Sequence, residues 1–133
     1  MITVLKVAAF LRRHHAPCRT WPKKNLVSWL LWLWELDAVA CVTDKGRLTG
    51  VGIARPVRSI VEGRDHYAVA NGGTILWVDL AAARNPRVIA LLLKQARERW
   101  GERLYVAFHR RKWARDTVLP WAAFMNRFNE KGA

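Results

Sequence analysis

The sequence has few cysteines and no apolar run long enough for a membrane span. Its 133 residues include only Cys18 and Cys41, with no CxxC motif and no histidine pair at zinc spacing beside them. This scarcity argues against a disulfide scaffold or a structural zinc site and favours a reducing compartment. The apolar stretch Leu26–Leu36 covers eleven residues, well short of the roughly 20 that span a bilayer. We therefore predict no metal, no transmembrane segment and a cytoplasmic location.

Acidic residues are scarce as well. Ten Asp and Glu face 23 Lys and Arg, which gives a formal net charge of +13. A field of this sign attracts polyanions, namely nucleic acid, anionic lipid headgroups or an acidic protein partner. The alternative is a generally basic protein whose charge marks no site.

Apolar residues make up 52% of the chain, and eight of them are tryptophans. This composition predicts one packed domain over residues 1–133, with most tryptophans in the core or lining a groove. Residues 3–13 are expected to form a helix capped by Thr3, and Leu26–Leu36 a second helix capped by Asn25 and buried on several sides. A hairpin is expected around residues 44–47, and another strand pair, "VRSIV" and "HYAVA", around residues 62–65.

The second half of the chain is more regular. "TILWVDL" reads as a central strand, and a helix follows it with Asn85 as N-cap, Pro86 at the first position and Gly101 at the C-terminal cap. "RLYVAFH" returns as a strand roughly parallel to the first. "TVLPWAAFMNRF" is expected to close the chain as a short helix interrupted near Pro120. The fold class is α/β (α+β), a mixed central sheet of about five strands flanked by helices.

This order of elements resembles the GNAT superfamily of acyltransferases. In that family a strand ending in Val-Asp leads into a glycine-containing loop whose backbone holds the pyrophosphate of coenzyme A at a helix N-terminus. "VDLAAARNPRVIALLL" has the family's spacing, but Arg87 and Ile89 stand where two glycines would be. The resemblance covers roughly residues 38–128 and implies that Arg84, Asn85, Arg87 and Val88 contact the cofactor. The glutamate and tyrosine that many GNAT proteins use as base and acid have no counterpart on the central strand or in the last helix.

A narrower resemblance is to the RTX-toxin-activating lysine acyltransferases, which look like GNAT proteins without the glycine loop. His15 precedes Trp21-Pro22 as a histidine does in that family, and "WVD" ends in Asp79. The resemblance implies acyl transfer to an amine, with the acyl chain taken from acyl-CoA or from the phosphopantetheine of acyl carrier protein. His15 would then be the general base, and Asp79 would orient it or stabilise its charged form. An acidic acyl carrier protein would be steered to Arg84 and Arg87.

Each of these residues also has a simpler interpretation. Asp79 can cap a loop, and His15 can be an ordinary surface residue. Arg84 and Arg87 can be solvated, although two cations at a helix N-terminus oppose its dipole. The basic stretch "HRRKWAR" supports a second hypothesis, a non-catalytic nucleic-acid-binding module, because it combines cations for phosphate contacts with an aromatic ring for base stacking. The residues concerned are Arg110, Arg111, Lys112, Trp113 and Arg115.

Overall fold

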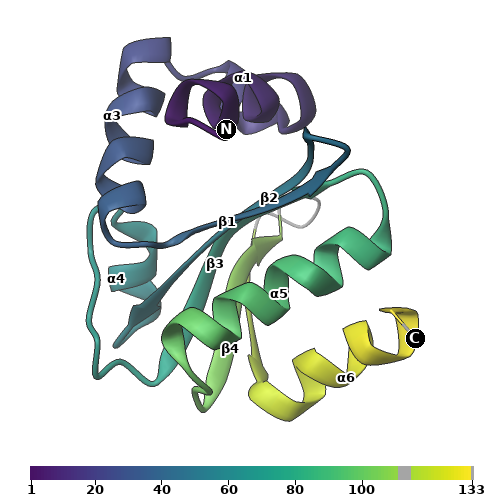
Figure 1. Ribbon diagram of the computed structural model, residues 1–133. Helices are drawn as coiled ribbons and strands as arrows, with labels where there is room; N and C mark the ends of the chain where they lie inside the picture. Colours follow the sequence, from purple (N-terminus) through teal and green to yellow (C-terminus); the bar gives the residue numbers. More distant parts are fainter. Residues whose placement is uncertain (111–114, 133) are drawn as a thin grey trace.

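The computed structural model describes residues 1–110 and 115–132 and contains a mixed sheet between two layers of helices (Figure 1). Helices α1, α3 and α4 lie on one face of the sheet, and α5 and α6 lie on the other. In chain order the elements are α1 (Val4–His14), α2 (Ala16–Arg19), α3 (Lys23–Glu35), β1 (Val39–Asp44), β2 (Arg47–Val57), α4 (Ile60–Arg64), β3 (Ile75–Ala83), α5 (Pro86–Trp100), β4 (Tyr105–Arg110), β5 (Arg115–Pro120) and α6 (Trp121–Gly132).

The sheet has five strands in the order β1-β2-β3-β4-β5. Strands β3 and β4 are parallel and joined through α5, whereas the other three neighbouring pairs are antiparallel. The predicted fold class is therefore confirmed, and β3 has the central position that its near-continuous apolar character indicated.

The predicted helix ends around α1 and α5 are also confirmed. Thr3 Oγ1 accepts a hydrogen bond from the Lys6 amide at 3.2 Å, and Asn85 Oδ1 accepts one from the Val88 amide at 3.1 Å. Gly101 ends α5 with a φ of 76°, a left-handed conformation that glycine adopts without strain. These caps satisfy amide groups that have no partner within a helix.

The prediction for α3 was wrong in two details. The helix begins at Lys23 and follows Pro22, so Asn25 lies in its first turn and does not cap it. The helix also buries a single face, through Leu26, Trp29, Leu30 and Leu33. Leu31 and Trp34 are exposed, because only one layer of structure covers α3.

The predicted strand pair around residues 62–65 was also wrong. Strand β2 ends at Val57, and Ile60–Arg64 forms the short helix α4. Ser59 Oγ accepts from the Glu62 amide at 3.2 Å, and Glu62 Oε1 accepts from the Arg58 amide at 3.1 Å. This reciprocal capping starts a helix despite the β-branched residues.

The closing helix predicted for residues 117–128 was wrong in its first part. Arg115–Pro120 is the edge strand β5, antiparallel to β4, and α6 begins directly after it at Trp121. Proline suits the end of an edge strand because it cannot donate a ladder hydrogen bond. Pro120 therefore separates a strand from a helix and does not interrupt one helix.

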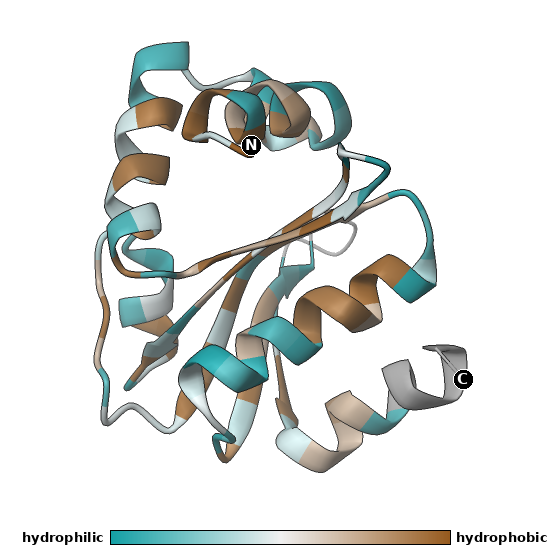
Figure 2. Ribbon diagram, viewed as in Figure 1, coloured by the Kyte–Doolittle hydropathy of each residue, from teal (hydrophilic) through white to brown (hydrophobic). Residues whose placement is uncertain are grey.

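Apolar residues run through the strands, along α3 and along the middle of α5, whereas hydrophilic residues gather at helix ends and turns (Figure 2). Helix α5 approaches β2 closely at Gly50 and Gly52, where an added Cβ would lie 2.3 Å from Val88 Cγ1 and 3.3 Å from Leu92 Cβ. Within the described part of the chain, no helix combines the length and apolarity needed to cross a membrane.

Candidate functional site

The larger of two cavities among the described residues opens where β3 and β4 separate. The two strands pair only over Ile75–Val78 and Tyr105–Phe108, although β3 continues to Ala83 and β4 to Arg110. The cavity has a volume of about 770 Å³, within the range of small-molecule sites. Both helical layers contribute to its walls, which include Cys18 and Trp29 from one layer and Ile89 and Phe124 from the other.

The cavity is mainly apolar and carries a limited set of polar side chains. Five aromatic residues line it: Trp21, Trp29, Trp77, Phe108 and Phe124. The ionisable residues in its walls are His15, Arg64, His66, Asp79, His109 and Asp116, besides Cys18. An apolar site with a few polar groups is typical of an enzyme or of a small-molecule binding protein.

The structure thus brings His15 and Asp79, the two predicted catalytic residues, to the walls of the same cavity. Each comes from a different part of the fold: His15 lies between α1 and α2, and Asp79 lies in β3. Their catalytic roles remain predictions.

Asp79 lies at an irregularity of the sheet. Pairing of β2 with β3 passes from Ile53–Leu80 to Ala54–Val78, so Asp79 has no register partner on β2. Such a bulge redirects a side chain that regular alternation would place elsewhere. The carboxylate meets Arg55, whose Nε donates to Oδ2 at 2.7 Å and whose Nη2 donates to Oδ1 at 2.8 Å.

The Arg55–Asp79 pair is buried and fully hydrogen-bonded. Arg55 is 0% exposed, and its remaining donors reach the carbonyls of Gly63, Asp65 and Ala68. Burial raises the pKa of Asp79, whereas the hydrogen bonds and charge of Arg55 act in the opposite direction. Because a guanidinium does not deprotonate in a protein, the ionised carboxylate is the form that leaves neither partner buried without a counter-ion.

This pairing bears on the predicted role of Asp79. Each of its carboxylate oxygens already accepts a hydrogen bond from Arg55. The contacts of Arg55 hold the loop at residues 63–68 against the sheet, and that loop carries His66 into the cavity wall. Asp79 therefore has a structural role that the sequence did not reveal.

The residues predicted to contact the cofactor lie at the start of α5. Arg84, Asn85 and Arg87 are exposed, whereas Val88 is buried. The Val88 amide already donates to Asn85, so it is not a bare donor for a phosphate. None of these four residues is in the cavity wall, but Ile89, the next residue of α5, is. The two arginines therefore stand at a helix end beside the cavity.

The basic stretch of the second hypothesis is described only in part. Arg110 ends β4 and Arg115 begins β5, and the two are register partners. Arg111, Lys112 and Trp113 lie outside the described residues.

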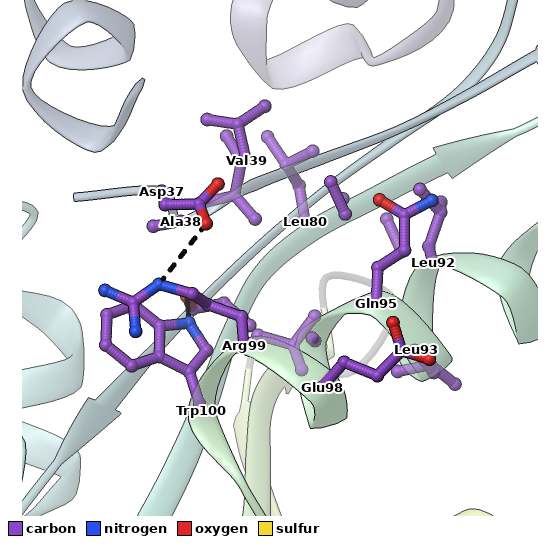
Figure 3. Close-up of a pocket in the computed structure, with 17 residues that line it drawn as sticks. Asp37, Ala38, Val39, Leu80, Leu92, Leu93, Gln95, Glu98, Arg99 and Trp100 are labelled. Atoms are coloured by element: carbon purple, nitrogen blue, oxygen red, sulfur yellow. Dashed lines mark hydrogen bonds and ion pairs between the residues drawn. The ribbon is translucent and has the colours of Figure 1, made fainter. Parts of the chain in front are cut away.

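A smaller cavity of about 390 Å³ lies between α5 and the first strands (Figure 3). Two of its polar side chains, those of Gln95 and Arg99, are already engaged. Gln95 donates to the Cys41 carbonyl at 2.9 Å and accepts from the Cys41 amide at 3.3 Å. Arg99 donates to the Leu36 carbonyl and lies 3.7 Å from the Asp37 carboxylate, and its guanidinium stacks on Trp100. These contacts protect the edge of β1 and favour a structural role.

Four further residues of the larger cavity were not predicted from the sequence: Arg64, His66, His109 and Asp116. His109 and Asp116 are register partners across the β4–β5 hairpin. That pairing was hidden because residues 117–120 were assigned to a helix. The β-branched pair Thr117-Val118 before Pro120 was the available signal for a strand.

Both cysteines are free thiols, and the described residues contain no group of three or more His, Cys, Asp or Glu side chains placed to hold a metal ion. Burial raises the pKa of Cys18 and of Cys41 to about 11, and the nearby Arg12 offsets part of the effect at Cys18. Comparison of the chain with protein-family models, with curated proteins and with solved structures found no match.

Proposed function

We propose that this protein is a GNAT-like acyltransferase that moves an acyl group from a thioester donor, acyl-CoA or acyl carrier protein, to an amine in the cytoplasm. The observation that carries the proposal is the aromatic-lined cavity at the point where β3 and β4 part. An acyl chain fits such a site because it buries apolar surface without requiring polar partners.

The separation of β3 from β4 supports a position for the thioester carbonyl beside the end of β3. Beyond Val78, strand β3 no longer pairs with β4, and Asp79, Leu80 and Ala81 line the cavity. The β4-facing backbone groups of this segment therefore point toward the opening between the strands. Backbone amides placed in this way can hold a carbonyl oxygen that gains negative charge during acyl transfer.

The positive charge at the start of α5 supports an acyl donor that carries phosphate groups. Arg84 and Arg87 are exposed on either side of the first residue of α5, five and two residues before Ile89, which lies in the cavity wall. The phosphates of coenzyme A or of a phosphopantetheine arm would lie there, with the acyl chain directed inward. Side chains, rather than the bare backbone of a glycine loop, would contact the phosphates.

The acidic surface of acyl carrier protein would also be attracted by the net charge of +13. The same charge supports the competing function, a nucleic-acid-binding module of this fold. The two functions differ in the ligand that the protein binds, an acyl thioester or a nucleic acid.

Thermal unfolding with different ligands tests the proposal. Dodecanoyl-CoA should raise the melting temperature more than coenzyme A does, because only the acylated compound fills the cavity. A short DNA duplex serves as a polyanion control, and each ligand is measured at low and moderate salt. Stabilisation by DNA alone, lost in moderate salt, would favour the nucleic-acid function.

A further inference from the structure

His109 and Asp116 form a hydrogen-bonded pair in the cavity wall. Nδ1 of His109 lies 3.0 Å from Oδ1 of Asp116, across the β4–β5 ladder. The other carboxylate oxygen, Oδ2, accepts from Arg64 Nε at 2.8 Å and from Arg64 Nη2. The Asp116 side chain is 5% exposed, whereas that of His109 is 49% exposed. All three residues line the cavity.

The contacts of Asp116 determine which ring nitrogen of His109 carries hydrogen. Burial alone would raise the pKa of Asp116, but the hydrogen bonds and charges of His109 and Arg64 lower it below its ordinary value. The carboxylate is therefore ionised at neutral pH and can only accept hydrogen bonds. Nδ1 of His109 must be the donor, which leaves Nε2 of the neutral ring with a lone pair.

We propose that His109 is the proton acceptor of the acyl transfer, with Asp116 as the residue that positions it and Arg64 as the residue that holds Asp116. This proposal rests on the proposed acyltransferase function. A half-exposed imidazole in the cavity wall is accessible to an amine from solvent, while the acyl chain lies inside. Asp79, the predicted partner of His15, differs from Asp116 because both of its carboxylate oxygens accept hydrogen bonds from Arg55.

The proposed transfer needs no reagent besides the thioester and the amine. The neutral acceptor amine attacks the thioester carbonyl carbon, and a C–N bond forms. Nε2 of His109 takes one proton from the nitrogen. The C–S bond then breaks, and the leaving thiolate receives that proton from the imidazolium. The products are an amide and a free thiol, and His109 returns to its neutral form.

Kinetics with defined probes test this assignment. The donor is the octanoyl thioester of N-acetylcysteamine, the acceptor is Nα-acetyl-lysine amide, and amide formation is followed by mass spectrometry. His109→Gln should lower kcat by about 100-fold or more, a typical loss for a proton-transferring group, and leave KM for the thioester unchanged. His14→Gln is the matched control, since His14 is exposed and packs on Phe10 outside the cavity.

Asp116 is tested by a readout that loss of packing would not change. Long-range ¹H–¹⁵N spectra should place the hydrogen of neutral His109 on Nδ1 in the wild-type protein and show a mixture of tautomers in Asp116→Asn. The variant should lose part of kcat and retain its KM. Circular dichroism and thermal unfolding establish that each variant is folded.

The outcomes separate the two proposals. Wild-type activity that is lost in His109→Gln and retained in His14→Gln supports the assignment. An active wild-type protein whose His109→Gln variant is equally active, or a His109 ring with its hydrogen on Nε2, overturns the role of His109 alone. A wild-type protein that transfers no acyl group to any amine overturns the acyltransferase function and, with it, the role of His109.

Discussion

Arg55 and Asp79 form a two-point ion pair inside the protein, with Nε–Oδ2 and Nη2–Oδ1 distances of 2.7 and 2.8 Å. The pair joins adjacent strands at the bulge in β3, and Arg55 extends from it to three carbonyl groups between Gly63 and Ala68. Arg55 therefore ties the segment at residues 63–68, which forms one wall of the cavity, to the sheet, and Trp29 adds a hydrogen bond from its Nε1 to the His66 carbonyl at 2.7 Å.

Replacing Arg55 by methionine should destabilise the protein by about 3–5 kcal/mol, because the substitution leaves the Asp79 carboxylate buried without its counter-ion. The free energy of unfolding is measured by urea denaturation, with Arg58→Met as control, since Arg58 is exposed. The double variant Arg55→Met/Asp79→Leu should lose less than the sum of the single losses. A loss below about 1 kcal/mol in Arg55→Met would contradict the structural role assigned to the pair.

Asp116→Asn should reduce stability in a pH-dependent manner. The pKa of Asp116 is lowered in the folded protein, so its contribution to stability is present above its unfolded value of about 3.8 and is lost as the pH falls through the folded value. We expect the variant to be about 1 kcal/mol less stable at pH 7 and the difference to shrink below about pH 4. Urea denaturation of both proteins between these pH values measures their free energies of unfolding. A difference that does not change with pH would contradict the expectation.

The two thiols should react slowly in the folded protein. Their pKa values are raised to about 11, so at pH 8 about one thiol in a thousand is ionised, compared with about one in ten at the ordinary value of 9.0. Iodoacetamide labelling followed by mass spectrometry should therefore be far slower than in guanidinium-unfolded protein. Equal rates in the two states would show that burial does not control these thiols.

The double variant Arg84→Ala/Arg87→Ala should weaken binding of dodecanoyl-CoA, because each arginine supplies a charged contact to a phosphate. We expect a loss of about tenfold or more, measured by isothermal titration. Lys94→Ala is the control, since Lys94 is exposed on α5 and lies away from its N-terminus. Equal affinities of the two variants would remove the phosphate site from the start of α5.

Much of the fold could be predicted from local signals. Asn85, Pro86 and Gly101 set the ends of α5 through capping and backbone preferences that act within a few residues. The hairpin at Lys45 and Gly46 depends likewise on positive φ angles in the turn. These features need no knowledge of distant residues.

The candidate site could be predicted less well because its contacts join distant segments. Arg55 meets Asp79 24 residues further on, and Arg64 meets Asp116 52 residues further on. His109 and Asp116 are paired only because β5 is a strand, and the apolar pattern of residues 117–120 also suited a helix. Placing His15 and Asp79 at one cavity required the family resemblance, since no local pattern links them.

Acyl transfer by the wild-type protein is the most direct test of the account. Acyl-CoA donors of increasing chain length are incubated with Nα-acetyl-lysine amide, and both the amide product and the released thiol are quantified. We expect equal amounts of the two products, with octanoyl and dodecanoyl donors transferred faster than acetyl, because the longer chains occupy the aromatic cavity. Absence of amide product with every donor, together with stabilisation of the protein by DNA alone, would contradict it.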